Sequence, residues 1–149
     1  MQRHHRHLLT PRRKARGVTL IDALIAMVIL AFGMLGMTRL QTRALAQTTE
    51  AQSRLVAAQY VDELLSSALI DATNHDCYTV PSSGTCGSTT ARNFTDAWET
   101  TVEGTALLRG AVATSTYTSS SGQLTVRITW TGKESGETRT HEGTTDVRN

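Results

Sequence analysis

Hydrophobic positions are concentrated in one run near the start of the chain, from Val18 to Met37. Asp22 is the only charged residue in this run, and the other interruptions are one threonine and two glycines. A helix rises about 1.5 Å per residue, so a run of this length spans about 30 Å, the thickness of the hydrocarbon core of a bilayer. The pattern predicts a membrane-spanning helix over residues 18–37.

The helix is predicted to continue beyond the membrane over residues 38–72. This segment contains no proline or glycine before Ala72 and is dominated by Ala, Leu, Gln, Arg and Glu, which favour helices. Apolar residues at helical spacing predict a face that packs on the rest of the protein. The predicted members of this face are Leu55, Ala58, Val61, Leu64, Leu65, Ala68 and Leu69. The two halves together form one helix of about fifty residues.

From Thr73 onward, segments typical of β-strands replace the helical pattern, which predicts a small head over residues 73–149. Strands are predicted over residues 107–108 with 111–117, over 123–131, and over 138–147, the last as a polar edge strand. The second of these places Leu124, Val126, Ile128 and Trp130 on one face. Residues 93–98 are predicted as a turn or a short helix that covers the sheet.

Charge is distributed unevenly along the chain. Six of the 15 basic side chains lie in residues 1–17 together with no acid, so nine basic and 13 acidic side chains remain for the rest. By the positive-inside rule, the basic segment holds the N-terminus in the cytoplasm and places the head on the other side. The remaining chain lacks an obvious basic patch, which argues against direct DNA binding.

Two cysteines in the head, Cys77 and Cys86, bracket the turn signal at residues 81–84. The head faces an oxidising space in this topology, so we predict a disulfide between them. Zinc bound through residues 75–77 (His-Asp-Cys) is the alternative, but zinc needs three or four protein ligands and only His141 would add another histidine. We therefore assign no metal and no cofactor.

Catalytic motifs do not stand out. The sequence contains no G-x-S-x-G, no phosphate-binding loop and no histidine helix motif. Asp96, Glu99 and Glu103 have a spacing that would suit an acid–base pair or calcium, but a solvated acidic helix face has the same spacing. We expect no catalytic residue, no enzyme and no small-molecule substrate.

Gly17 and Asp22 distinguish the apolar run from a plain anchor. Asp22 lies one helical turn inside the run, and a charge costs up to ~3 kcal/mol at the bilayer centre and less near its edge. Such a cost favours a partner for the carboxylate. Cleavage after Gly17 would leave an ammonium group on Val18, and this group could meet Asp22 of another copy. The alternatives are an ordinary signal anchor and a cleaved secretory signal, although a secretory hydrophobic region is shorter, at roughly 7–15 residues.

The segment Arg16-Gly17-Val18-Thr19-Leu20-Ile21-Asp22 resembles the class III signal of type IV pilins and type II secretion pseudopilins. The continuation over residues 29–41 is similar to PilV-type minor pilins in particular. The resemblance places leader cleavage between Gly17 and Val18, N-methylation on Val18, and the acid that sets subunit register at Asp22. Peptidase recognition would use Arg16, Gly17, Thr19, Leu20 and Ile21. Aspartate is one methylene shorter than the family's glutamate, and valine is less common than phenylalanine or methionine as the first mature residue.

The resemblance implies an α+β pilin fold, in which a small antiparallel sheet packs on the C-terminal half of a long N-terminal helix. It implies a leader over residues 1–17 that prepilin peptidase/methyltransferase removes, and storage in the inner membrane with a periplasmic head. The subunit would then join other major and minor pilins through the assembly platform. It would enter a cell-surface type IV pilus at low copy and serve adhesion, twitching motility or DNA uptake.

Three other interpretations remain. The chain could be a minor pseudopilin of a type II secretion system, which gene neighbours or co-purification would reveal. It could also be a membrane-anchored periplasmic binding or adhesin protein that keeps its N-terminal segment. An enzyme tethered to the membrane would require activity in the soluble portion, which we do not expect.

Overall fold

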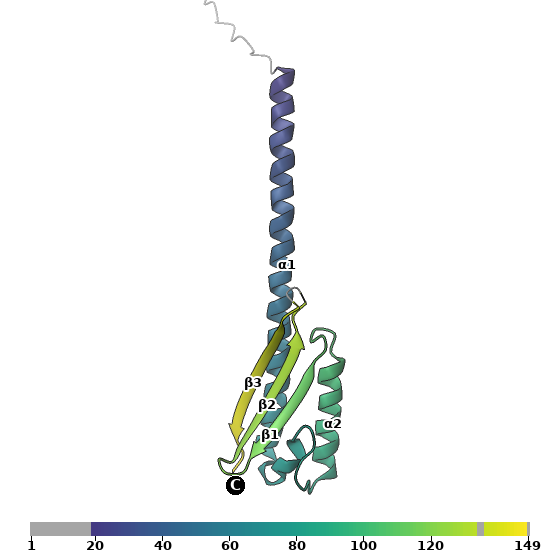
Figure 1. Cartoon of the computed structure of the whole chain (residues 1–149), viewed down its shortest axis with the longest axis vertical. Helices are drawn as coiled ribbons and strands as arrows, with labels where there is room; N and C mark the ends of the chain where they lie inside the picture. The colour runs from purple at the N-terminus through teal and green to yellow at the C-terminus, as the bar shows by residue number, and fades with distance from the viewer. Residues whose placement is uncertain (1–18, 134–135, 149) are drawn as a thin grey trace, which may run out of the picture. The chain divides into compact units, whose positions relative to one another are not determined.

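The computed structural model describes residues 19–133 and 136–148 (Figure 1). The elements follow the order α1 (Leu20–Ile70), η1 (Ala72–Tyr78), α2 (Thr89–Gly104), β1 (Val112–Thr118), β2 (Gln123–Thr131) and β3 (Thr138–Asp146). A long N-terminal apolar helix and a small three-stranded antiparallel sheet make this an α+β protein with a pilin-like architecture, which confirms the predicted fold class. The chain divides into two compact units, Met1–Gln41 and Thr42–Asn149.

The α1 helix is 51 residues long, in agreement with the predicted helix of about fifty residues. Its residues 42–70 belong to the second unit, which we call the head. The helix ends at Ile70, and η1 begins two residues later with Asn74 N–H donating to Asp71 C=O at 2.9 Å. Asp71 and Asn74 favour turns because their short polar side chains bond nearby backbone and side-chain groups.

The buried face of α1 differs from the predicted one. Its buried residues are Ser53, Ala57, Val61, Leu64, Leu65 and Ala68. Leu55 and Leu69 were predicted to be buried but are 61% and 54% exposed, so this part of the prediction is wrong. The helix carries large apolar side chains on more than one face, and its buried face includes the small residues Ser53 and Ala57. Sequence spacing alone did not separate these faces.

The α2 helix is longer than predicted and runs over 16 residues instead of residues 93–98. It begins where the Ser88 side chain accepts a hydrogen bond from Ala91 N–H, a standard N-cap. Ala91, Thr95, Trp98 and Val102 are buried at helical spacing. The indole N–H of Trp98 donates to the backbone carbonyl of Tyr60 at 3.0 Å and so links α2 to α1.

The sheet has the order β1-β2-β3, so the predicted edge position of the last strand is confirmed. Leu124, Val126, Ile128 and Trp130 are all buried, as the alternation predicts. The predicted strand at residues 107–108 is wrong, because these residues lie in the turn between α2 and β1. Leu108 is nevertheless fully buried, so the apolar pair marks the core and not a strand.

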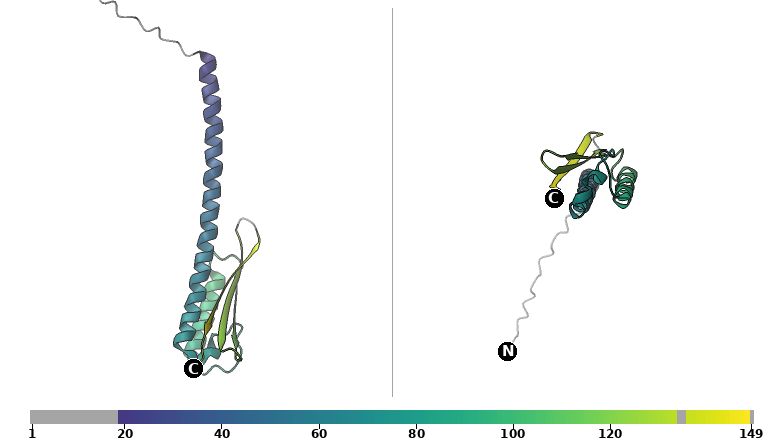
Figure 2. Two further views of the ribbon diagram at one scale, coloured as in Figure 1. Left: turned by 90° about the vertical axis from the view of Figure 1, so that its left-hand side faces the viewer. Right: turned by 90° about the horizontal axis from the view of Figure 1, so that it is seen from below.

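Both helices lie on the same face of the sheet within the head (Figure 2). The opposite face is polar and carries threonines on all three strands together with the Arg127–Glu142 ion pair. Gly143 of β3 lies against α1, where a Cβ atom would come within 2.6 Å of Val61 Cγ1 and 2.9 Å of Leu65 Cδ1. A glycine at this point lets the strand approach the helix closely.

Candidate functional site

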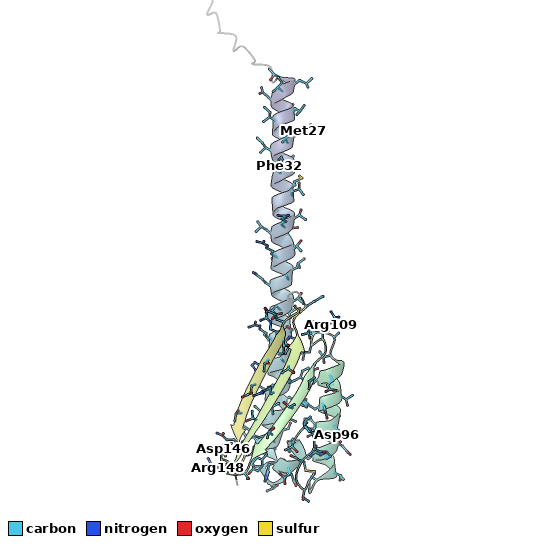
Figure 3. The ribbon with its side chains drawn as sticks, in the orientation of Figure 1. Met27, Phe32, Asp96, Arg109, Asp146 and Arg148 are labelled. Carbon is cyan, nitrogen blue, oxygen red and sulfur yellow. A yellow bond between two sulfur atoms is a disulfide. The ribbon has the colours of Figure 1, made fainter. Side chains whose placement is uncertain are left out.

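The first unit consists, in its described part, of an apolar helix segment without a core. Every described residue from Thr19 to Gln41 is exposed, including Leu20 at 82% and Phe32 at 72%. The side chains of Met27 and Phe32 project away from the helix in Figure 3. Contiguous apolar surface of this extent normally contacts lipid or other protein, and α1 is long and apolar enough to cross a membrane.

Asp22 lies in the first turn of α1, where its negative charge is favoured by the helix dipole. Thr19 N–H donates to Asp22 Oδ2 at 3.3 Å, which resembles the backward-reaching half of a capping box. The Asp22 side chain forms no ion pair within the described residues. The carboxylate is therefore held near the start of the helix and is exposed among the described residues.

The residues assigned to leader processing fall on both sides of the boundary of the described structure. Arg16, Gly17 and Val18 lie outside the described residues, so the proposed cleavage and methylation site has no described geometry. Thr19, Leu20 and Ile21 are exposed at the start of α1. A Cβ atom added at Gly33 or Gly36 of the same segment would meet no other atom within 4 Å, so the helix surface there is open to a close neighbour.

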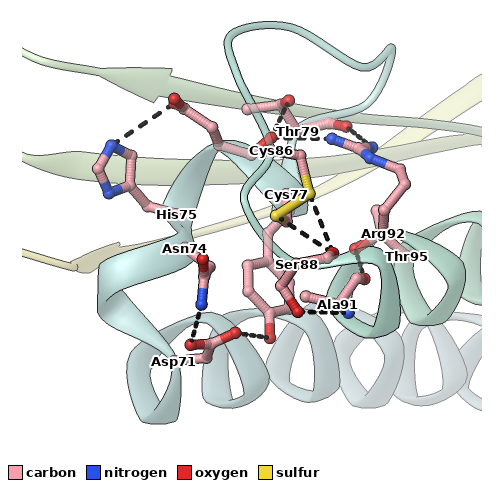
Figure 4. Close-up of a disulfide and its surroundings, with 12 residues drawn as sticks. Asp71, Asn74, His75, Cys77, Thr79, Cys86, Ser88, Ala91, Arg92 and Thr95 are labelled. Carbon is pink, nitrogen blue, oxygen red and sulfur yellow. Dashed lines mark hydrogen bonds and ion pairs between the residues drawn. A yellow bond between two sulfur atoms is a disulfide. The ribbon is translucent and has the colours of Figure 1, made fainter.

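The two cysteines of the head, Cys77 and Cys86, form a disulfide (Figure 4). The loop that it closes is also fixed by Arg92, which donates to the carbonyl of Thr79 at 2.9 Å and to that of Asp76 at 2.8 Å. Since both sulfurs are bonded to each other, neither is available as a zinc thiolate. The disulfide and Arg92 thus anchor the segment between η1 and α2 to the head.

The histidines considered for metal binding lie in different places. His75 packs its ring against Tyr117 with the centroids 4.0 Å apart, and its Nε2 lies 3.5 Å from Asp76 Oδ1. His141 lies on β3, opposite Ile128 of β2. The residues 75–77 and His141 therefore do not form the ligand set that the zinc alternative required.

The acidic residues of α2 lie on its outward side. Asp96 and Glu103 are exposed, and Glu99 is partly buried beside them. Burial raises the pKa of the Glu99 carboxyl above its usual value, the charges of Glu103 and Asp96 raise it further, and Arg92 lowers it. The described residues contain no group of three or more His, Cys, Asp or Glu side chains arranged to hold a metal ion.

Comparison with known families gives one match. Residues 12–38 match the prokaryotic N-terminal methylation motif. No curated protein and no solved structure matches the chain. The motif supports the class of type IV pilin-like and pseudopilin proteins, a structural class and not an enzymatic one. It implies processing by prepilin peptidase and assembly with other pilins, and with the apolar helix it indicates a membrane-anchored protein.

Sequence reasoning missed one feature of the head. A cleft lies between the turn after α2, the end of β2 and residues 49–53 of α1. The sequence offers only a weak signal: Trp130 lies near the end of an alternating strand and Lys133 follows it, while Arg109 is far away along the chain. The long-range approach of three segments cannot be read from spacing along the chain.

Proposed function

We propose that this chain is a minor pilin: prepilin peptidase cuts after Gly17 and methylates the amine of Val18, and the subunit enters a type IV pilus at low copy to prime or modify its assembly. The observation that carries the proposal is the single acid, Asp22, in the first turn of an exposed apolar helix that matches the methylation motif. The similarity of residues 29–41 to PilV-type minor pilins supports the minor role.

The apolar half of α1 supplies the driving force for assembly in this proposal. Its exposed side chains exchange contact with lipid for contact with the helices of other pilins, a change driven by packing and not by removal from water. Gly33 and Gly36 permit close approach of those helices.

In this proposal, Asp22 sets the axial register between neighbouring subunits. Its carboxylate pairs with the α-ammonium of a neighbouring mature subunit, which requires cleavage because the prepilin has no charged amine at that point. An ion pair in a dry environment is favourable only when both charges are present, and either charge alone is costly to bury. The bond from Thr19 N–H already directs the carboxylate toward the start of the mature chain.

The assembly role of Asp22 is tested by Asp22→Ala in cells that depend on this subunit for piliation. We expect the variant to be cut and methylated but to leave the cells with few or no pili, counted by electron microscopy. Asp62→Ala is the matched control, because Asp62 is an exposed acid on the same helix but in the head. Normal pilus numbers with Asp22→Ala would contradict the register role.

A minor pseudopilin of type II secretion is the second candidate, because the methylation motif is shared by both systems. Co-purification separates the two. The minor pilin proposal expects the mature chain in sheared pili, whereas a pseudopilin would copurify with a secretion apparatus and be absent from sheared pili.

A further inference from the structure

A groove runs between α1 and α2 in the head, and we call it the α1–α2 groove. It consists of two adjoining hollows of about 340 and 220 Å³, and Phe94 lines both of them. The lining residues used below are Tyr60, Glu63, Ser67 and Ile70 on α1 and Phe94 and Ala97 on α2. All of them belong to the same compact unit.

The α1–α2 groove has the length and direction of a surface that binds a helix. Its four lining residues on α1 have the three- and four-residue spacing of one helix face, and they extend over about 15 Å. Trp98 Nε1 donates to the carbonyl of Tyr60 at 3.0 Å at one end, and Ala91 lies beside Ile70 at the other. The two helices therefore run antiparallel and side by side (Figure 2). Their side-chain ridges leave between them a channel in which a third helix can pack.

Aromatic rings give the α1–α2 groove an apolar surface. Tyr60 and Phe94 pack against the core but are only partly buried, and Ile70 at one end is 88% exposed. The Phe94 ring meets the buried ring of Tyr78 edge-on, with the centroids 6.4 Å apart. Aromatic residues are enriched at protein interfaces, where they contribute a large apolar contact area. The groove therefore favours an apolar partner.

The charge of the α1–α2 groove is negative. Among the described residues, its lining includes two acids, Glu63 and Asp71, and no lysine or arginine. Asp71 accepts hydrogen bonds from Asn74 Nδ2 at 2.7 Å and from the Tyr78 hydroxyl at 3.3 Å. Glu63 forms no ion pair within the described part of the chain. A partner that combines apolar side chains with neighbouring cations matches this surface.

The apolar half of α1 has this composition. Arg39 and Arg43 are the only charged residues between residues 23 and 49, and they follow directly after the apolar run. Every described residue from Thr19 to Gln41 is exposed, so this segment has apolar surface to offer to another molecule. The methylation motif includes the apolar run, so an adjoining subunit of the same class supplies a helix of the same kind.

We propose that the α1–α2 groove binds the apolar N-terminal helix of an adjoining pilin subunit. Phe94 and Ala97 contact its apolar side chains, and Glu63 lies beside the basic residues that follow its apolar run, which are Arg39 and Arg43 in this chain. This inference rests on the proposed function, which supplies the adjoining subunit. It assigns α2, an element outside the methylation motif, to the assembly surface, and it is separate from the pairing of Asp22.

Photo-cross-linking from the α1–α2 groove in piliated cells is the most direct test. p-Benzoylphenylalanine replaces Ala97, which is exposed, and after irradiation the cross-linked peptides of sheared pili are identified by mass spectrometry. We expect the adduct to contain the apolar N-terminal helix of another pilin. The same probe at Thr116, which is exposed on the opposite face of the sheet, is the matched control and should not give this adduct.

The other outcomes of this experiment overturn a stated claim. Cross-links from position 97 to lipid alone, to the head of another subunit or to nothing overturn the inference when the chain is present in sheared pili. The same adduct from positions 97 and 116 also overturns it. A chain that keeps its leader, or that is absent from sheared pili, refutes the proposed function and the inference with it.

Blocking the α1–α2 groove tests its role in assembly. Ala97→Arg places a long cation in the groove and should lower the amount of this subunit in sheared pili about tenfold, while its leader is still removed. Thr116→Arg is the matched control for an added surface cation. Equal incorporation of the two variants overturns the proposal.

Two neighbouring acids on α1 test the charge complementarity. Glu63 lines the groove, whereas Asp62 is exposed and does not line it. Glu63→Lys should lower incorporation about fivefold, because it would oppose the cations of the entering helix, and Asp62→Lys should leave incorporation unchanged. Equal incorporation of these two variants overturns the role assigned to Glu63.

Discussion

The carboxylate of Asp22 accepts a hydrogen bond within its own chain and, in the proposed function, pairs with the terminal amine of a neighbouring subunit. In the structure it accepts a hydrogen bond from Thr19 N–H at 3.3 Å, so its position is set by the first turn of α1. The bond involves one oxygen and leaves the side chain exposed. A fixed but accessible acid is what a register contact requires, since less side-chain freedom is lost when the partner arrives.

Gly143 sets how closely β3 approaches α1. We expect Gly143→Ala to lower the free energy of unfolding by about 1–3 kcal/mol, because the added Cβ would overlap Val61 and Leu65 in a packed core. Urea unfolding of the full chain in detergent, followed by circular dichroism, measures the change. Gly104→Ala is the matched control, as no atom lies within 4 Å of a Cβ at that position. Equal stability of the two variants would show that the close approach is not tight.

Glu99 links stability to pH. Its raised pKa, caused mainly by burial and then by Glu103 and Asp96, means that the folded state holds this proton more tightly than the unfolded state. The contribution of Glu99 to the free energy of unfolding therefore rises as the pH falls from neutrality, through the raised pKa of the folded state, toward the usual pKa of 4.5. We expect Glu99→Gln to be slightly more stable than the unmodified chain at pH 7 and to gain less on acidification, measured by urea unfolding at pH 7 and pH 5. An unchanged pH dependence would contradict this role, and exposed Asp62→Asn provides the control for loss of one charge.

Among the elements, the strands were the most predictable. β2 and β3 agree with the predicted limits to within one residue. Strict alternation marks β2 as a half-buried strand, and a polar, threonine-rich composition marks β3 as an edge strand. Most of α2 was not predicted, because its threonines and asparagine are weak helix formers. Its buried residues are few and widely spaced, so they give only a weak helical pattern in the sequence. Its N-cap residue, Ser88, is the one helix-start signal that the sequence contains at this point.

Only those parts of the candidate site that are contiguous in the sequence were predictable. The acid, the apolar run and the methylation motif are contiguous, so they can be recognised in sequence. The cleft at Trp130 joins residues about eighty positions apart on three elements, and the buried face of α1 depends on where the sheet packs. Tertiary contacts determine both features. The helical spacing of Leu55 and Leu69 therefore did not show that these residues are exposed.

The disulfide belongs to the segment between η1 and α2. Closing so short a loop is expected to stabilise the head by about 2.5 kcal/mol, mainly by restricting the unfolded chain. Urea unfolding with and without a thiol reductant tests this value on the unmodified chain. The Cys77→Ser, Cys86→Ser double variant should be insensitive to the reductant. A reductant effect of the same size in both proteins would show that it does not act through this disulfide.

At the scale of the whole molecule, the two units satisfy their apolar surfaces in different ways. The head buries its core between the sheet and the helices, with Trp98, Val126 and Ile128 among its members. The described part of the first unit buries nothing within the chain, so its apolar surface requires lipid or other helices. Leu55, Leu69 and Ile70 add exposed apolar positions on α1 within the head, which are available to neighbouring subunits.

We interpret the first 17 residues as a leader that is removed before the subunit functions. Intact-mass analysis of the membrane-extracted chain, from cells with and without prepilin peptidase, tests this interpretation. We predict that the chain from peptidase-containing cells lacks residues 1–17 and carries one added methyl group, while the chain from peptidase-deficient cells has the full, unmethylated mass. A full-length, unmethylated chain in both strains would contradict the account.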